Sequence, residues 1–167
     1  MTCIMQVRAV NFSAVPGKLK QKRRSGCPVS ISLEVFGDRW SLLVIRDLMV
    51  RGYRTFKEFE QSGEGIATNI LAHRLKKLRA AGIIETERDP TDGRKLNYRL
   101  TQKGIDLAPV LLELLIWGGQ HEQTGAPCQA IDYMEQNRQA VLAEVRRRWR
   151  ERDPRPFLPS FPTGGRG

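Results

Sequence analysis

The sequence predicts a mainly α-helical domain that contains one small β-hairpin. Apolar residues recur at helical spacing through the central part of the chain, the spacing changes to alternation over residues 83–100, and helical spacing then returns. The chain has 167 residues, of which 40% are hydrophobic and 28% are charged, and these proportions are typical of a globular domain. A chain of this length can bury a core of its own.

Composition divides the chain into four parts. Residues 1–26 lack periodicity and carry six cationic and no acidic side chains, so we expect a basic, flexible N-terminal arm. Residues 27–122 carry the alternating helical and strand patterns and form the expected folded domain. Residues 123–152 form a C-terminal helical extension, with one helix predicted over about 129–149. Four prolines and three glycines predict a disordered tail over residues 153–167.

Two helices are predicted at the start of the folded domain. Pro28 suits the first position of a helix over residues 28–36. Gly37 then breaks the pattern, and Asp38 is expected to cap a second helix that continues to Met49. The first helix is expected to have an apolar face made of Ile31, Leu33 and Val35.

A helix-turn-helix pattern follows. Thr55 and Glu58 have the spacing of a capping box, so a short helix is expected to begin there. Gly63 and Gly65 bracket a tight turn, and a longer helix is predicted over residues 67–81. Its buried side is expected to consist of Leu71, Leu75 and Leu78. A short helix, a turn and a longer helix together make up this motif.

The alternating segment predicts a hairpin directly after this motif. Residues 83–88 and 94–100 are predicted as strands, joined by an Asp-Gly-containing turn over residues 89–93. One face is expected to be buried and the other basic. The expected buried residues are Leu96, Tyr98 and Leu100, and the alternating ones are Lys95, Asn97 and Arg99. The complete prediction is therefore a winged helix-turn-helix.

The helix predicted after the hairpin is apolar on nearly every side. Thr101 is expected to cap it, and Pro109 is expected either to bend it or to mark the start of its second half. A helix with so much apolar surface is covered either by its own domain or by a partner chain.

The net charge of +10 is distributed unevenly. Residues 27–73 hold five cationic and six acidic side chains, residues 74–103 hold nine and four, and residues 104–125 hold three acidic ones. A basic arm alone proves little about nucleic acid. A basic stretch on a helix and a hairpin within a nearly neutral domain is a stronger indication of nucleic-acid binding.

The exposed side of the helix over residues 67–81 is the predicted DNA-reading surface. A major groove admits a helix, and its floor offers donors and acceptors to polar side chains. In this motif the N-terminal half of the helix usually meets the base edges. The polar side chains opposite the leucines are Thr68, Asn69, His73, Lys76 and Lys77. The alternative interpretation is an ordinary solvated helix face.

The hairpin is expected to add contacts to the DNA backbone. Arg94 and Lys95 stand at its tip, and Arg88 and Arg99 extend the same basic surface. The alternative is a solvated hairpin whose charges only prevent edge pairing. That alternative does not explain why the basic stretch continues onto the preceding helix.

Short motifs occur in a specific order along residues 27–121. They are Cys27-Pro28-Val29, Gly37-Asp38-Arg39-Trp40, Leu43, Arg46-Asp47-Leu48, Arg54-Thr55-Phe56, Leu71, Arg74-Leu75, Leu78, Gly82-Ile83-Ile84, Tyr98, Leu100-Thr101, Gly104, Trp117-Gly118 and His121. This ordered set resembles the HxlR family of bacterial transcription regulators. The resemblance implies a dimeric winged helix-turn-helix that dimerises through its terminal helices, with a recognition helix over residues 67–81 and a wing over residues 83–100. Family members often have Ser where this chain has Ala67, so Thr68 is the expected cap instead.

Cys27 is the candidate redox sensor. A helix N-terminus favours the thiolate, and the basic arm before it adds to that effect. Its position resembles that of the cysteine with which some HxlR-type regulators sense oxidants or electrophiles. A purely structural cysteine is the alternative, and an intersubunit pair with Cys128 stays open.

The remaining residues predict no enzyme, no cofactor and no metal site. Two histidines and three scattered cysteines provide neither a metal-ligand cluster nor a secreted disulfide framework. Gly63-Glu64-Gly65 lacks the strand-then-helix context of a phosphate-binding loop. No apolar run approaches the roughly 18 residues that span a bilayer, so we expect no membrane partner and a cytoplasmic protein.

The sequence therefore predicts a homodimeric transcriptional regulator. Its expected partner is double-stranded DNA at a pseudo-palindromic operator, its effector is unknown, and its response to thiol chemistry depends on Cys27. The alternative is a winged-helix interaction module that docks the same exposed helix on a partner protein.

Overall fold

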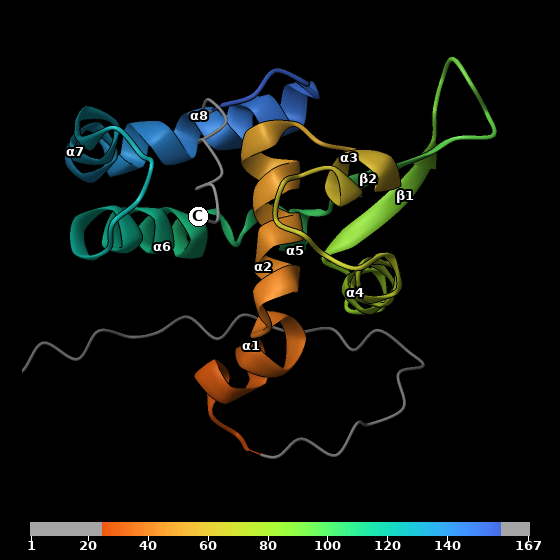
Figure 1. The fold of residues 1–167 in the computed structure, drawn as a ribbon, viewed down its shortest axis with the longest axis horizontal. Coiled ribbons are helices and arrows are strands. Elements are labelled where there is room, and N and C mark those ends of the chain that lie inside the picture. The colour runs from red at the N-terminus through yellow and green to blue at the C-terminus, as the bar shows by residue number, and fades with distance from the viewer. Residues whose placement is uncertain (1–24, 158–167) are drawn as a thin grey trace, which may run out of the picture.

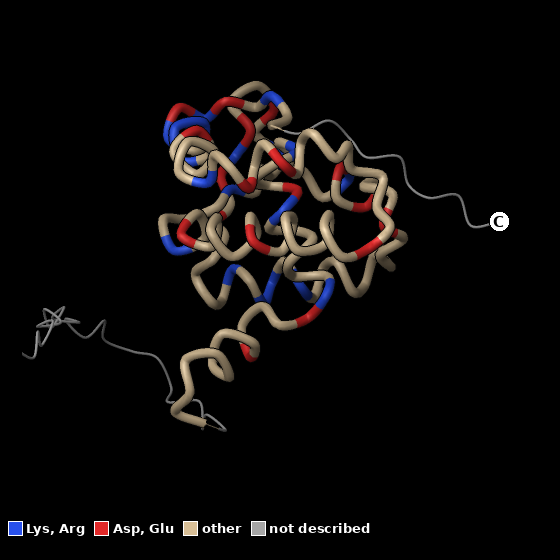
Figure 2. Tube along the Cα trace, turned by 90° about the vertical axis from the view of Figure 1, so that its left-hand side faces the viewer, with Lys and Arg blue, Asp and Glu red and all other residues tan. Residues whose placement is uncertain are grey.

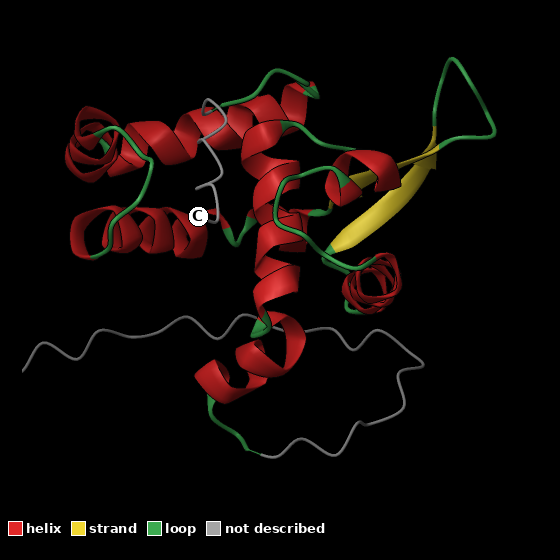
Figure 3. Ribbon diagram, in the orientation of Figure 1, coloured by secondary structure: helices red, strands yellow, loops and turns green. Residues whose placement is uncertain are grey.

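The computed structural model describes residues 25–157, and these residues form a helical body from which one β-hairpin projects (Figures 1 and 3). Nearly all of the expected basic arm, residues 1–24, lies outside the described residues. So do residues 158–167 of the expected tail. The architecture is the predicted winged helix-turn-helix.

The first two helices follow the prediction closely. α1 (Pro28–Phe36) and α2 (Arg39–Arg46) meet at Gly37, and the carboxylate of Asp38 caps α2 by accepting the Ser41 backbone N–H at 2.9 Å. α2 continues into a π-helical turn over Asp47–Arg51, which the apolar spacing did not predict. Gly52 ends this turn with a φ of +73°, a conformation that favours glycine.

α1 buries none of its residues fully, although Val35 of the expected apolar face packs against the core. The Leu33 side chain is 57% exposed, and Val29 is 67% exposed. Within one protomer, the apolar side of this helix is only partly covered.

The helix-turn-helix forms as predicted. α3 (Phe56–Glu60) begins with the complete capping box of Thr55 and Glu58. α4 (Thr68–Ala80) buries the three predicted leucines, Leu71, Leu75 and Leu78. The α3–α4 turn relies on Gly63 and Gly65, whose φ angles are +84° and +71°.

The wing is a two-stranded antiparallel hairpin, and its alternation fails near the tip. β1 (Ile84–Arg88) pairs with β2 (Leu96–Leu100). Asn97 is buried and Leu96 is 50% exposed, the reverse of the expected order. The reason is polar bonding in the turn, because the Asn97 side-chain amide donates to the Asp89 carboxylate at 2.9 Å.

The C-terminal part contains more helices than predicted. α5 (Gln102–Ile105) begins at the Thr101 cap, and Pro109 lies in the first turn of α6 (Ala108–His121), so it marks a new helix. The extension is two helices, α7 (Cys128–Gln136) and α8 (Arg138–Glu151), and the prediction of one helix over residues 129–149 is wrong. The helices separate at Asn137, whose backbone and side-chain N–H groups both donate to the Tyr133 carbonyl at 2.9 Å.

One connected core joins these elements. α8 lies beside α6 on the side of the molecule away from the wing tip, and its other end approaches the wing (Figure 1). The core includes residues of the helix-turn-helix together with Leu111, Leu112, Met134, Val141 and Val145. No helix among residues 25–157 is both long and apolar enough to cross a membrane.

The prediction of a disordered tail is wrong for its first five residues, 153–157. Residues 153–157 follow α8 back across the body, where the Phe157 N–H donates to the Val50 carbonyl at 2.6 Å. The Phe157 side chain also packs against the core.

Candidate nucleic-acid interface

α4 exposes a polar face opposite its buried leucines. The exposed side chains on this face are Thr68, Asn69, His73, Lys76 and Arg79. The side chains of His73, Lys76 and Arg79 make no hydrogen bond or ion pair with other residues of the described range 25–157. Their donors and acceptors are therefore available to a ligand. Arg79 was not among the candidate residues, although the basic stretch over residues 74–103 already included it.

Thr68 does not cap α4 as expected. Ala67 occupies the N-cap position without a side-chain hydrogen bond. The Thr68 hydroxyl instead donates to the Glu60 carboxylate of α3 at 2.7 Å. This bond links the ends of the two helices of the motif.

Lys77 lies at the edge of the exposed face. Its Nζ is 3.8 Å from the Asp38 carboxylate, and Nε of Arg74 is 3.2 Å from the same group. The two cations tie α4 to the start of α2. Lys77 is therefore partly engaged within the domain, whereas Lys76 is free to face a ligand.

A buried ionic network positions the turn before α4. Asp47, which is 2% exposed, accepts two hydrogen bonds from Arg46, and Arg46 also donates to Glu64 at 2.8 Å. Arg51 donates to the Ser62 carbonyl at 3.0 Å. Burial raises the pKa of Asp47 above its ordinary value, although the neighbouring arginines oppose the shift. The network fixes the π-helical turn against the turn that orients α4.

The wing tip presents two exposed cations. The Arg94 side chain is 93% exposed and lies 3.3 Å from the Asp92 carboxylate, while Lys95 is 66% exposed and lies 3.8 Å from it. Hydrogen bonds from Thr91 and Asn97 hold the pKa of Asp89 well below its usual range. The turn is thus locally organised, and its two cations extend into solvent.

Arg99 lies elsewhere than the sequence predicted. Its side chain is only 21% exposed, and Nη2 donates to the Trp149 carbonyl of α8 at 3.0 Å. Nη1 lies 3.9 Å from Glu85. This side chain belongs to the joint between wing and α8, so we do not include it in the interface.

Over the body as a whole, charges of both signs are interspersed (Figure 2). The polar face of α4 carries Lys76 and Arg79, for which no ion pair with another described residue is found, and the wing tip carries Arg94 and Lys95, both close to Asp92.

A family model described as HxlR-like helix-turn-helix matches residues 35–125. The chain belongs to the HxlR family. The matched segment runs from the end of α1 through α6, and it includes the whole helix-turn-helix and wing. α7 and α8 lie beyond it.

Relatives of known sequence and structure are transcriptional regulators. The helix-turn-helix-type regulator YybR of Bacillus subtilis (strain 168) is 33% identical over 95 residues, which are 57% of this chain and 75% of YybR. The regulator YodB of the same organism is 35% identical over 100 residues, which are 59% of this chain and 88% of YodB. The solved structure of the redox regulator HypR in its oxidised form is 31% identical, with a TM-score of 0.52 over 58% of this chain and 99% of HypR. PA1607, a candidate transcription factor, is 39% identical, with a TM-score of 0.56 over 64% of this chain and 71% of that one.

Cys27 lies eight residues before the start of the segment that the HxlR family model matches. It is the N-cap residue of α1, and its side chain is exposed. The backbone N–H groups of Ser30 and Val29, at the N-terminus of α1, lower the pKa of the thiol. The predicted location at a helix N-terminus is confirmed.

Proposed function

We propose that this protein is a homodimeric regulator that binds double-stranded DNA sequence-specifically and acts in the cytoplasm. The observation that carries the proposal is the exposed polar face of α4, held in place by three buried leucines and by the Asp38 carboxylate. The regulatory activity of the HxlR relatives supports it.

In the proposed complex, α4 enters the major groove. Asn69 and His73 lie in its N-terminal half and read base edges, while Thr68 orients the start of the helix through Glu60. Lys76 and Lys77 lie in its C-terminal half and neutralise phosphates. Arg94 and Lys95 of the wing tip contact the flanking backbone, so binding weakens steeply as salt rises.

The second protomer is proposed to cover the exposed apolar side of α6 and α1. Val110, Leu114 and Trp117 recur at helical spacing on α6, and they are 42%, 48% and 57% exposed. Such a stripe is costly to leave in water, and a copy of the same helix can cover it. Two α4 helices would then enter successive major grooves about 34 Å apart and match a pseudo-palindromic operator.

Cys27 is proposed as the thiol through which oxidants or electrophiles alter DNA binding. Its exposure and lowered thiol pKa favour the reactive thiolate at neutral pH. The similarity to a redox regulator supports this role.

A titration of fluorescent DNA duplexes tests the proposed function. We expect tighter binding to promoter DNA near the protein's own gene than to random DNA of equal length, with both affinities falling steeply with salt. Equal affinity for both duplexes at every salt concentration would contradict sequence-specific binding. Such a result would favour the interaction module instead.

A further inference from the structure

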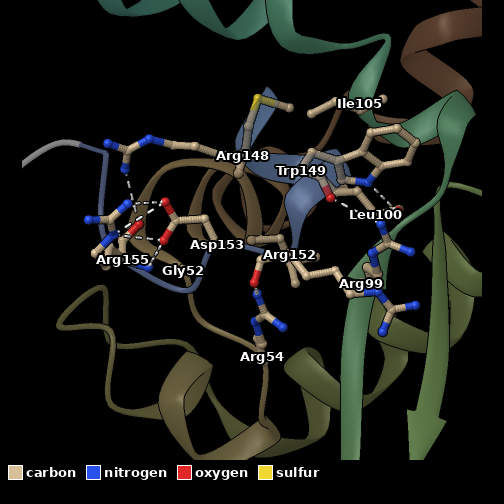
Figure 4. A pocket seen from close by; sticks show the side chains of 12 residues that line it. Gly52, Arg54, Arg99, Leu100, Ile105, Arg148, Trp149, Arg152, Asp153 and Arg155 are labelled. Carbon is tan, nitrogen blue, oxygen red and sulfur yellow. Dashed lines mark hydrogen bonds and ion pairs between the residues drawn. The ribbon is translucent and has the colours of Figure 1, made fainter. Parts of the chain in front are cut away.

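A small cavity lies between the C-terminal end of α8 and the base of the wing. The cavity is also bordered by the loop that precedes α3. Figure 4 shows the Trp149 ring beside Leu100, and Arg54 extending toward Arg152. None of α8 lies in the segment that the HxlR family model matches, residues 35–125.

The wing needs support on its outer edge. A two-stranded hairpin is marginally stable by itself, and an edge strand leaves backbone groups without partners. Two contacts satisfy backbone groups on the outer edge of β2. The Tyr98 N–H donates to the Arg54 carbonyl at 2.7 Å, and the Trp149 indole Nε1–H donates to the Leu100 carbonyl at 2.8 Å. The indole therefore occupies a position that a third strand would otherwise take.

Two further side-chain contacts join α8 to the wing. The Arg99 guanidinium lies 5.1 Å from the centre of the Trp149 ring and also donates to the Trp149 carbonyl. Arg152 lies 2.9 Å from the Glu87 carboxylate on β1. The end of α8 is thus joined to both strands.

The chain that follows α8 is held as well. A Cβ added at Gly52 would lie 2.2 Å from the Pro154 carbonyl oxygen, so the segment passes directly over the end of the π-helical turn. Arg54 donates to the Arg152 carbonyl at 3.1 Å, which also satisfies a carbonyl at the C-terminus of α8. These contacts fix the end of α8 relative to the helix-turn-helix as well as to the wing.

We propose that α8 sets the orientation of the wing, with Trp149 as the positioning residue. In this orientation the side chains of Arg94 and Lys95 can contact the DNA backbone. The inference rests on the proposed DNA-binding function. The competing explanation is that α8 contacts DNA directly through its exposed arginines, of which Arg150 makes no ion pair with other described residues.

Trp149→Phe tests the proposal in the full-length protein. Phenylalanine retains most of the ring but removes the donor to Leu100. We expect amide hydrogen exchange in β1 and β2 to become about 5-fold faster while exchange in α4 is unchanged, because one hydrogen bond to the wing is lost. The dissociation constant for operator DNA is expected to rise about 3- to 10-fold. Arg150→Gln is the matched control and is expected to change the affinity less than about 2-fold.

A double-mutant cycle distinguishes positioning from direct contact. If Trp149 acts through the wing tip, Trp149→Phe costs no further affinity in a protein that already carries Arg94→Gln and Lys95→Gln. An equal loss in both backgrounds would overturn the proposal, as would unchanged wing exchange in Trp149→Phe. A large loss in Arg150→Gln would support direct contact instead.

Arg152→Gln provides a second test through an exposed side chain, should Trp149→Phe fail to fold. We expect a smaller acceleration of exchange in β1, and no additional effect when Glu87→Gln is already present, because the two side chains form one pair. Additive effects would overturn the assignment. The exchange measurements need no DNA. They therefore test whether α8 stabilises the wing even if the wild-type protein shows no sequence preference.

Discussion

Nε of Arg74, in the middle of α4, lies 3.2 Å from Oδ1 of Asp38, the residue that caps α2. The same carboxylate accepts the backbone N–H and the hydroxyl of Ser41 at 2.9 and 2.6 Å. One side chain therefore stabilises the start of α2 and holds the proposed recognition helix against it. The position of α4 depends on this group as well as on the leucine core.

Replacing Asp38 separates its two contributions. Asp38→Ala removes the cap and the ion pairs, so we expect the free energy of unfolding to fall by about 1 to 2 kcal/mol. Asp38→Asn retains a capping side chain and loses only the charge, with an expected loss of about 0.5 kcal/mol. Urea denaturation of both variants measures the difference. Equal losses would mean that Asp38 contributes only through its charge.

The contribution of Asp38 is expected to depend on pH. Burial raises the pKa of this carboxyl, but hydrogen bonds from Ser41 and the charges of Arg74 and Lys77 outweigh burial and hold the pKa below its ordinary value of 3.8. Because the folded pKa is depressed, the stability is present above the ordinary pKa and is lost as the pH falls through the folded pKa. The difference in unfolding free energy between wild type and Asp38→Asn should be constant from about pH 7 to 5 and decrease below about pH 4. A difference that grows toward acidic pH would show that the sign is wrong.

The exposed stripe on α6 predicts a monomeric variant. A glutamate in place of Leu114 places a charge at the centre of the proposed interface, so Leu114→Glu is expected to dissociate the dimer at micromolar concentrations. Analytical ultracentrifugation measures the mass. Leu96→Glu is the matched control, because Leu96 is similarly exposed, at 50%, but lies on the wing. This substitution is expected to leave the dimer intact. A dimeric Leu114→Glu protein would place the interface elsewhere.

The lowered thiol pKa of Cys27 predicts preferential alkylation. At neutral pH we expect iodoacetamide to modify Cys27 several-fold faster than it modifies a flexible peptide with the same flanking residues, because more of the thiol is ionised at the N-terminus of α1. Peptide mapping by mass spectrometry follows the reaction. A rate equal to that of the peptide would remove the support for a reactive thiolate.

Sequence patterns predicted the helix-turn-helix well because its signals are local. The capping box at Thr55 and Glu58, the glycine turn and the leucine spacing each depend on neighbouring residues. The position of the Arg99 side chain could not be predicted in the same way. It depends on Trp149, which lies fifty positions later in the chain.

The errors at Leu96 and Asn97 and at the end of α7 have a similar origin. In both places the side-chain amide of an asparagine donates a hydrogen bond to a nearby polar group, and this bond overrides the apolar pattern. In the wing Asn97 donates to the Asp89 carboxylate, and at the end of α7 Asn137 donates to the Tyr133 carbonyl. Asn137 was embedded in an otherwise continuous helical pattern. Tertiary contacts also explain why residues 153–157, rich in proline, are packed against the body.

The central claim is that α4 reads DNA sequence and the wing binds the DNA backbone. Its most direct test measures dissociation constants for operator and random duplexes with wild type, Asn69→Ala, His73→Ala and Arg94→Gln. The two α4 variants should lose about 1 to 3 kcal/mol of binding free energy for the operator and little for random DNA. Arg94→Gln should weaken binding to both duplexes alike, and it should reduce the slope of log affinity against log salt concentration by about 1. Uniform losses of equal size in all three variants would contradict this division between reading and backbone binding.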